Sequence, residues 1–119
     1  MRVLQFLSST GFHGAESMTA ELVRQLAAQG VTVDIAVLDN RGRGDQGIFD
    51  AVGGSARHLL RLPCDGQLDL ATFRSLAGHV RRHGIDVIHS HKYKTTFYAG
   101  LIRRRLGVGL VTTYHNWIT

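Results

Sequence analysis

The chain has 119 residues, of which 44% are hydrophobic and 19% charged, and its formal net charge is +5 when histidine is neutral. That length fits one domain with a real core rather than two, and the composition excludes a wholly disordered chain. No apolar run approaches the roughly 20 residues of a membrane helix, and the short apolar start lacks the pattern of a signal peptide. The single cysteine, Cys64, cannot form an internal disulfide, so we expect a cytoplasmic protein.

Apolar runs alternate with segments whose apolar residues recur at helical spacing. Strands are predicted at residues 2–7, 31–38, 57–62, 86–89 and 110–114, and helices at residues 15–29, 70–83 and 95–106. Residues 39–54 are predicted as a loop with one short helix near residues 48–52. Met18 and Leu70 belong to the apolar stripes expected to face the core. Asp69 is a predicted helix cap, and Gly30 and Gly84 are predicted helix stops.

Strands that alternate with crossover helices predict a parallel sheet. We therefore expect an α/β fold, a Rossmann-like doubly wound parallel sheet of about five strands. Ligands of such sheets bind outside the carboxyl ends of the strands. Polar segments follow four of the predicted strands, at residues 8–14, 39–40, 89–94 and 115–117. Their convergence predicts a binding site at this edge.

The first of these segments opens a helix and contains Gly11, His13 and Gly14. Glycines let the backbone approach a ligand closely, and free amides at a helix start attract anions. The loop is neither a GxGxxG fingerprint nor a P-loop, so a dinucleotide site is unsupported. Glu16 in the first helical turn is explained equally well by helix capping and by a ligand contact.

The other segments contribute histidines and both lysines. His89 and His91 would share one face of a strand, but no zinc-type partner motif accompanies them, so metal binding is the minor interpretation. One of the two is expected to be packed or hydrogen-bonded structurally. Lys92 and Lys94 flank Tyr93 and could hold a phosphate or a sugar diphosphate. His115 follows the last predicted strand and could act as a hydrogen-bonding or acid/base group.

Three motifs in order resemble those of one enzyme family. Gly-Ala-Glu at residues 14–16 resembles a Gly-Gly-x-Glu loop, Asp-Val-Ile-His-Ser-His at residues 86–91 resembles a DVIHxH strand, and Thr-Thr-Tyr-His-Asn at residues 112–116 resembles a TxHD strand end. The chain thus resembles the N-terminal part of a GT-B fold, GT4-type retaining glycosyltransferase, closest to those of surface-polysaccharide or lipopolysaccharide assembly. His13 departs from the usual first glycine, and Asn116 from the usual aspartate.

The resemblance implies an enzyme that moves a sugar from a UDP- or GDP-sugar to a glycan or lipid-linked acceptor, with retention and with neither a metal nor another cofactor. It places Gly11, His13 and Gly14 in the cleft loop near the donor phosphates. It assigns the acceptor side to Glu16, His91 and Lys94. It makes His115 the catalytic candidate, in contact with the donor sugar near the reacting carbon.

The resemblance also implies that residues 1–119 are a truncated acceptor-side domain, because the C-terminal donor-binding domain with its E-x7-E motif is absent. We expect such a chain to be inactive alone and to self-associate through the exposed surface of an unfinished sheet. A stand-alone flavodoxin-like module that binds a nucleotide or phosphate is the alternative. Calorimetry with nucleotides discriminates the two.

The net positive charge suits phosphate-bearing partners in general. Nothing matches a DNA-reading helix or an RNA-binding aromatic motif, so we expect no nucleic-acid partner. Residues 103–105 are three arginines near Phe97, Tyr98, Leu101 and Ile102, a combination that could dock on an anionic membrane at the inner face. A core-facing helix with a basic solvent end is the favoured interpretation of the same segment.

Overall fold

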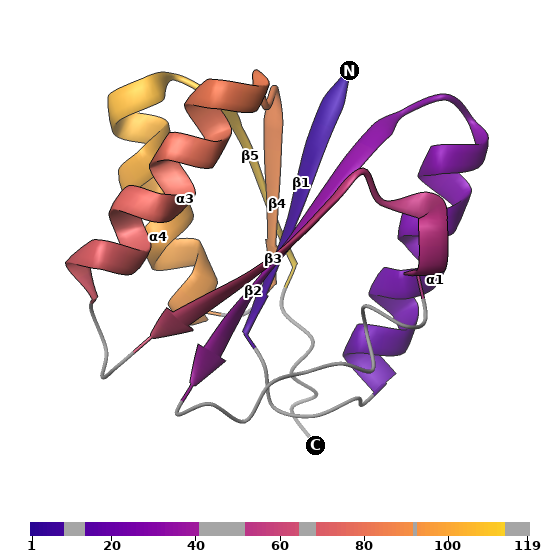
Figure 1. The fold of residues 1–119 in the computed structure, drawn as a ribbon, viewed down its shortest axis with the longest axis horizontal. Helices are drawn as coiled ribbons and strands as arrows, with labels where there is room; N and C mark the ends of the chain where they lie inside the picture. Colours follow the sequence, from indigo (N-terminus) through magenta and orange to yellow (C-terminus); the bar gives the residue numbers. More distant parts are fainter. Residues whose placement is uncertain (9–13, 41–51, 65–68, 92, 114–119) are drawn as a thin grey trace.

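The computed structural model describes residues 1–8, 14–40, 52–64, 69–91 and 93–113 (Figure 1). One parallel sheet contains β1 (Arg2–Ser8), β2 (Thr32–Asn40), β3 (His58–Cys64), β4 (Val87–His91) and β5 (Gly109–Thr113). The helical elements are α1 (Gly14–Ala28), the 3-10 turn η1 (Gly53–Ser55), α3 (Leu70–His83) and α4 (Tyr93–Leu106). The strand order is β3-β2-β1-β4-β5. Because α1 covers one face and α3 and α4 the other, the predicted doubly wound, Rossmann-like α/β fold is confirmed.

Helix α3 begins and ends where the sequence predicts. The Asp69 carboxylate accepts hydrogen bonds from the backbone N–H of Ala71 at 3.0 Å and of Thr72 at 3.3 Å. These bonds satisfy two amides that the helix itself leaves unpaired. At the other end Gly84 has φ +62°, and its N–H donates to the carbonyl of Val80. Only glycine adopts this left-handed conformation without strain, so Gly84 stops the helix.

Alternate residues of each strand enter two separate cores, one on each face of the sheet. Leu4 and Phe6 face the core under α3 and α4, whereas Leu7 and Val33 belong to the core under α1. Tyr98 of α4 is fully buried against Phe6, with ring centroids 6.4 Å apart, and its hydroxyl accepts from the Asp69 N–H at 2.8 Å. Burial on both faces explains why the strands read as continuous apolar runs.

The predicted core stripes were wrong at two positions. Met18 is 65% exposed and Leu70 is 59% exposed. A helix buries residues spaced by three or four positions, and the stripe of α3 runs through Thr72, Leu76, His79 and Val80. Leu70 lies two positions before Thr72 and therefore faces away from the sheet. In α1 the buried positions are Thr19, Ala20 and Val23, so Met18 lies beside the buried stripe and not in it.

Three predicted strand ends were also wrong. Strand β3 continues through Pro63 to Cys64 and does not end at residue 62. Strand β2 continues to Asn40, so residues 39–40 belong to the strand and not to the segment that follows it. Strand β4 continues to His91, and α4 already begins at Tyr93, so Lys94 lies in a helix and not in a loop. The end of β4 was missed because Ser90 and His91 are polar. Their position in the strand follows from pairing with Thr112 and Thr113 of β5.

One carboxylate lies within the sheet near its amino edge. Asp34 of β2 is 1% exposed and accepts from Nε2 of His79 at 2.6 Å and from Nη2 of Arg57 at 3.2 Å, and Nδ1 of His58 lies 3.3 Å from the same oxygen. Burial alone would raise the pKa of Asp34. The hydrogen bonds from Arg57, His79 and His58 outweigh burial, so the pKa lies below its ordinary value.

Candidate functional site at the carboxyl edge of β1 and β4

The order of the strands reverses between β1 and β4. Strand β1 pairs with β2 on one side and with β4 on the other, and the chain leaves β1 and β4 toward helices on opposite faces (Figure 1). In open α/β sheets the carboxyl edge at such a switch point forms a crevice that binds ligands. The topology therefore places the candidate site at the ends of β1 and β4.

A buried polar pair joins these two strands. Nε2 of His91 donates to Oε1 of Gln5 at 2.9 Å, and the two residues are 4% and 0% exposed. The His89 ring lies against that of His91, with centroids 4.3 Å apart. Within the described residues, Nε2 of Gln5 has no hydrogen-bond partner. A buried amide donor without a partner is costly, so this group needs an acceptor from outside the described residues.

Hydroxyl groups tie the start of α4 to the ends of β4 and β5. Oγ of Ser90 lies 2.9 Å from Oγ1 of Thr96 and 3.3 Å from Oγ1 of Thr112. Thr95 donates from its hydroxyl to the carbonyl of His91. These bonds hold the first turn of α4 against the ends of β4 and β5.

The backbone brings the described members of the predicted site to this edge. Gly14 begins α1, Glu16 lies in the first turn of α1, His91 ends β4, and Lys94 lies in the first turn of α4. The expectation that one histidine of the β4 pair is structural is met by His91, which is buried and bonded to Gln5. The side chains of Glu16 and Lys94 lie outside the described part of the structure. Gly11, His13 and His115 lie outside the described residues altogether.

Sequence reasoning missed Gln5, Thr96 and Thr112. Gln5 is the one polar residue between Val3 and Leu7 in a strand that is otherwise apolar, and that interruption is a usable signal. The two threonines give no such signal, because the contact of Thr112 with Ser90 needs the pairing of β4 with β5, and that of Thr96 needs the turn from β4 into α4.

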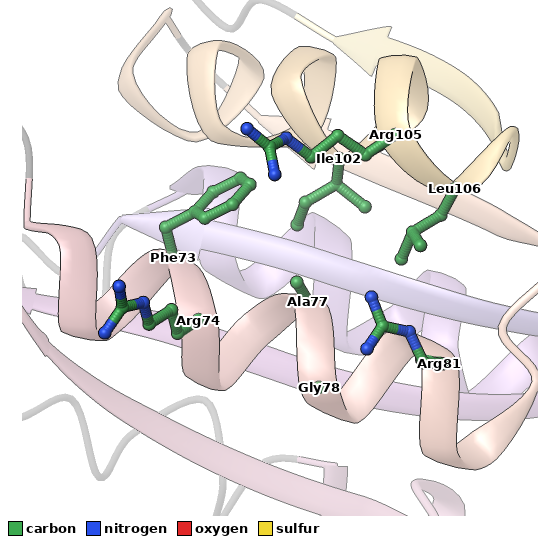
Figure 2. Close-up of a pocket in the computed structure, with 8 residues that line it drawn as sticks. All are labelled: Phe73, Arg74, Ala77, Gly78, Arg81, Ile102, Arg105 and Leu106. Carbon is green, nitrogen blue, oxygen red and sulfur yellow. The ribbon is translucent and has the colours of Figure 1, made fainter.

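A second concave feature lies away from this edge, between α3 and α4. It is a groove of about 280 Å³. Figure 2 shows the apolar side chains and the guanidinium groups that line it. Its lining comprises Phe73, Arg74, Ala77, Gly78, Arg81, Ile102, Arg105 and Leu106. Tyr98 and Ile102 are fully buried, as the favoured interpretation of a core-facing helix predicts, whereas Phe97 is 54% exposed. No described helix is both long and apolar enough to cross a bilayer.

Comparison with solved structures gives the same fold. A glycosyltransferase from Rickettsia africae ESF-5 matches with a TM-score of 0.79 and 15% identity, over 99% of this chain and 30% of that one. MurG from Acinetobacter baumannii matches with a TM-score of 0.73 and 15% identity, over 99% of this chain and 36% of that one. The C-terminal domain of the PF1911 hydrogenase from Pyrococcus furiosus matches with a TM-score of 0.65 and 10% identity, over 94% of this chain and 90% of that one.

The chain thus spans about a third of the length of the first two structures, and at these identities the likeness concerns the fold alone. No curated protein matched the sequence. The family model described as Glycosyltransferase Family 4 matches residues 12–119, which is nearly the whole chain. The family predicted from the three sequence motifs is confirmed: this chain belongs to glycosyltransferase family 4.

Proposed function

We propose that the chain is the acceptor-side domain of a glycosyltransferase that moves a sugar from a nucleotide-sugar to a glycan or lipid-linked acceptor. The observation that carries this proposal is the family 4 match over residues 12–119. The polar groups at the β1–β4 switch point support it, because they lie where this fold class binds ligands. We further propose surface-polysaccharide or lipopolysaccharide assembly as the process, on the basis of the basic motif variants at residues 89–94 and 115–117.

Within this proposal the chain supplies one wall of the active-site cleft. Gly11, His13 and Gly14 approach the donor phosphates, and His115 contacts the donor sugar. Glu16, His91 and Lys94 serve the acceptor side. Since His91 is 4% exposed, its role in this conformation is to position the edge through Gln5 more than to offer surface to the acceptor. We propose retention of the sugar's configuration and no metal in the transfer step.

The first prediction concerns sugar transfer. Residues 1–119 alone should transfer no sugar from labelled UDP- or GDP-sugars to candidate acceptors, because in the proposed enzyme most donor contacts come from a second domain. The same chain joined to the donor domain of a family 4 glycosyltransferase should transfer sugar, and product anomers read by NMR should show retention. Turnover by the 119 residues alone, or no turnover by any such two-domain protein that folds and binds its donor, would count against the proposal.

Nucleotide binding discriminates this function from the flavodoxin-like module. An acceptor-side domain binds a free nucleotide weakly, since in the proposed enzyme most donor contacts come from the other domain. Tight one-to-one binding of a nucleotide to residues 1–119 in calorimetry would favour the stand-alone module instead.

We also propose peripheral contact with an anionic membrane at its cytoplasmic face, through the groove between α3 and α4. Arg81 and Arg105 line the groove, and Phe97 is exposed on α4. Each arginine near an anionic bilayer contributes about 1 kcal/mol. The double variant R81Q/R105Q should therefore lower partitioning onto phosphatidylserine-containing vesicles at low salt roughly 30-fold.

A matched control removes the same charge elsewhere. Arg24 of α1 and Arg61 of β3 are exposed and lie outside the groove. R24Q/R61Q should bind vesicles nearly as well as the unaltered chain. Equal losses in the two double variants would indicate a general charge effect without a docking face.

Self-association remains a prediction. Both outer strands of the sheet expose an apolar side chain, Val111 of β5 at 52% and Leu59 of β3 at 44%. Unpaired outer strands with exposed apolar groups favour pairing between copies. We therefore propose that copies of the chain associate through these strands.

A further inference from the structure

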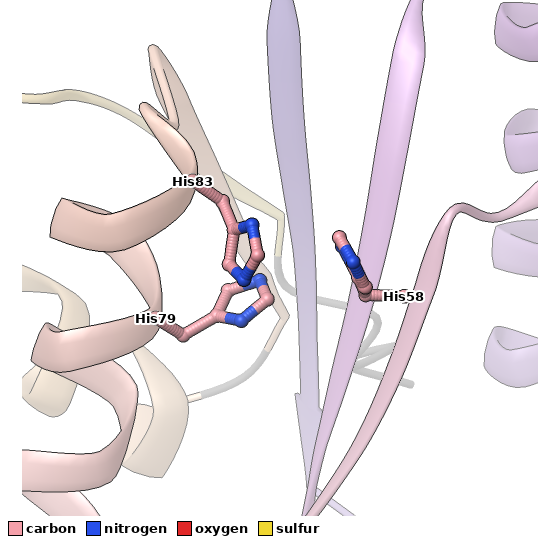
Figure 3. A group of neighbouring side chains, drawn as sticks. All are labelled: His58, His79 and His83. Atoms are coloured by element: carbon pink, nitrogen blue, oxygen red, sulfur yellow. The ribbon is translucent and has the colours of Figure 1, made fainter.

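Three histidines gather at the amino edge of the sheet, opposite the proposed transfer site. His58 begins β3, and His79 and His83 lie in the last turns of α3 (Figure 3). One ring nitrogen of each lies within 4.8 Å of the others. The ring centroids are 4.3 Å apart for His58 and His83, 4.4 Å for His79 and His83, and 5.5 Å for His58 and His79.

The local structure explains why these rings meet. His79 and His83 are four residues apart on a helix, so their side chains lie on the same face. His58 begins a strand whose alternate residues, Leu60 and Leu62, belong to the core under α3. The side chain of His58 therefore points toward the same helix (Figure 3).

Imidazole nitrogen is a ligand that Zn²⁺ and similar divalent transition metals prefer. Three histidines with a water in the fourth position form a known type of tetrahedral zinc site, with Zn–N distances of about 2.1 Å and N···N separations of about 3.4 Å. Small rotations of His58 and His83, which are only partly buried, would bring the nitrogens from their present spacing to that value. Their partial exposure also leaves an entry path and room for the water.

The surroundings of the cluster supply an orienting carboxylate. Histidines that bind metals commonly donate their other ring N–H to a carboxylate. Asp34 accepts from His79 at 2.6 Å, so it already orients that ring. Nδ1 of His58 lies 3.3 Å from Asp34 and accepts a hydrogen bond from Nε of Arg57 at 3.0 Å, so the Asp34–Arg57 pair holds the second ring. The negative charge of Asp34 lies next to the histidine cluster, and the Arg57 guanidinium forms an ion pair with the same carboxylate.

Arg2 of β1 donates a hydrogen bond to the backbone carbonyl of His83, which joins the end of α3 to the first strand.

We propose that His58, His79 and His83 together bind one divalent transition-metal ion of the Zn²⁺ class. Such an ion joins the start of β3 to the end of α3 and stabilises the amino edge of the sheet. It has no part in the proposed sugar transfer, which takes place at the carboxyl edge. The metal site and the transfer function are therefore tested by separate experiments, and the failure of one proposal leaves the other unaffected.

The experiment uses the 119-residue chain, freed of any histidine tag and dialysed against a chelator. Calorimetry with Zn²⁺ at pH 7.5 should give one site per chain, and Tm should rise with zinc concentration. Co²⁺ should give the visible absorption of a tetrahedral nitrogen site. The variant H83Q should weaken zinc binding by more than about 100-fold, because even changes outside the ligands cost 10–100-fold.

The variant H89Q is the matched control, since it removes a histidine from β4 and leaves the cluster intact. It should bind zinc as the unaltered chain does. H58Q offers a second test on a partly exposed ligand if H83Q is poorly folded. Zinc binding that survives both H83Q and H58Q, or that is lost only in H89Q, overturns the proposal, and so does the absence of one-to-one binding in the unaltered chain.

Discussion

Replacing Asp34 with alanine should lower the free energy of unfolding by about 3 kcal/mol, because the change leaves buried donors without their shared acceptor. His79 is 6% exposed at its side chain and would lose the acceptor of its buried N–H, whereas Arg57 is 30% exposed and can turn to water. For a chain of this size the loss corresponds to a fall in Tm of roughly 10 °C. Thermal and urea unfolding followed by circular dichroism measure it.

The exposed pair of Glu21 and Arg24 on α1 provides the control. Both side chains are about half exposed, and ion pairs of this kind contribute little. The variant E21A should unfold at nearly the same temperature as the unaltered chain. Equal Tm values for D34A and E21A would show that the Asp34 network does not stabilise the sheet.

The effect of Asp34 should depend on pH in a defined direction. Because the pKa of Asp34 in the folded chain lies below its ordinary value of about 3.9, its contribution is fully present above that value. It is lost as the pH falls through the lower, folded pKa. The part of the stability difference between the unaltered chain and D34A that comes from ionised Asp34 should thus shrink in acid.

Much of the fold could be predicted because its signals are local. Asp69 and Gly84 mark the ends of α3 through bonds to residues no more than four positions away, so their meaning is visible in the sequence. The alternation of strands and helices likewise gives the doubly wound class. The order of the strands could not be read in this way, because the pairing of β1 with β4 joins residues more than 80 positions apart.

The candidate site shows the same division. Its location at the carboxyl edge follows from topology, but the partners of its side chains do not. His91 appeared to lie in a loop because it follows polar residues, whereas its bond to Gln5 places it in the sheet. The cluster of His58, His79 and His83 was missed for a similar reason: only the helical spacing of His79 and His83 is local, and the third ring comes from β3.

Replacing His115 with alanine should have the largest effect on catalysis. In a two-domain protein built from this chain and a family 4 donor domain, we expect kcat to fall by about 100-fold or more, as it does when a single group that stabilises developing charge is removed. The acceptor KM should change little, because the proposed partner of His115 is the donor sugar near the reacting carbon. Steady-state kinetics with a labelled nucleotide-sugar separate the two parameters.

The variant H91A gives the contrasting result. His91 is buried and bonded to Gln5, so its loss leaves both polar groups of the Gln5 amide without partners among the described residues and loosens the edge that positions the acceptor. We therefore expect H91A to raise the acceptor KM and to lower Tm, in contrast to H115A. If H115A left kcat within threefold of the unaltered protein, the donor-side role of His115 would be wrong. If H91A left the acceptor KM unchanged and lowered kcat by the same factor as H115A, the division of the cleft into donor and acceptor sides would be wrong instead, because a loss of acceptor positioning should appear in the acceptor KM.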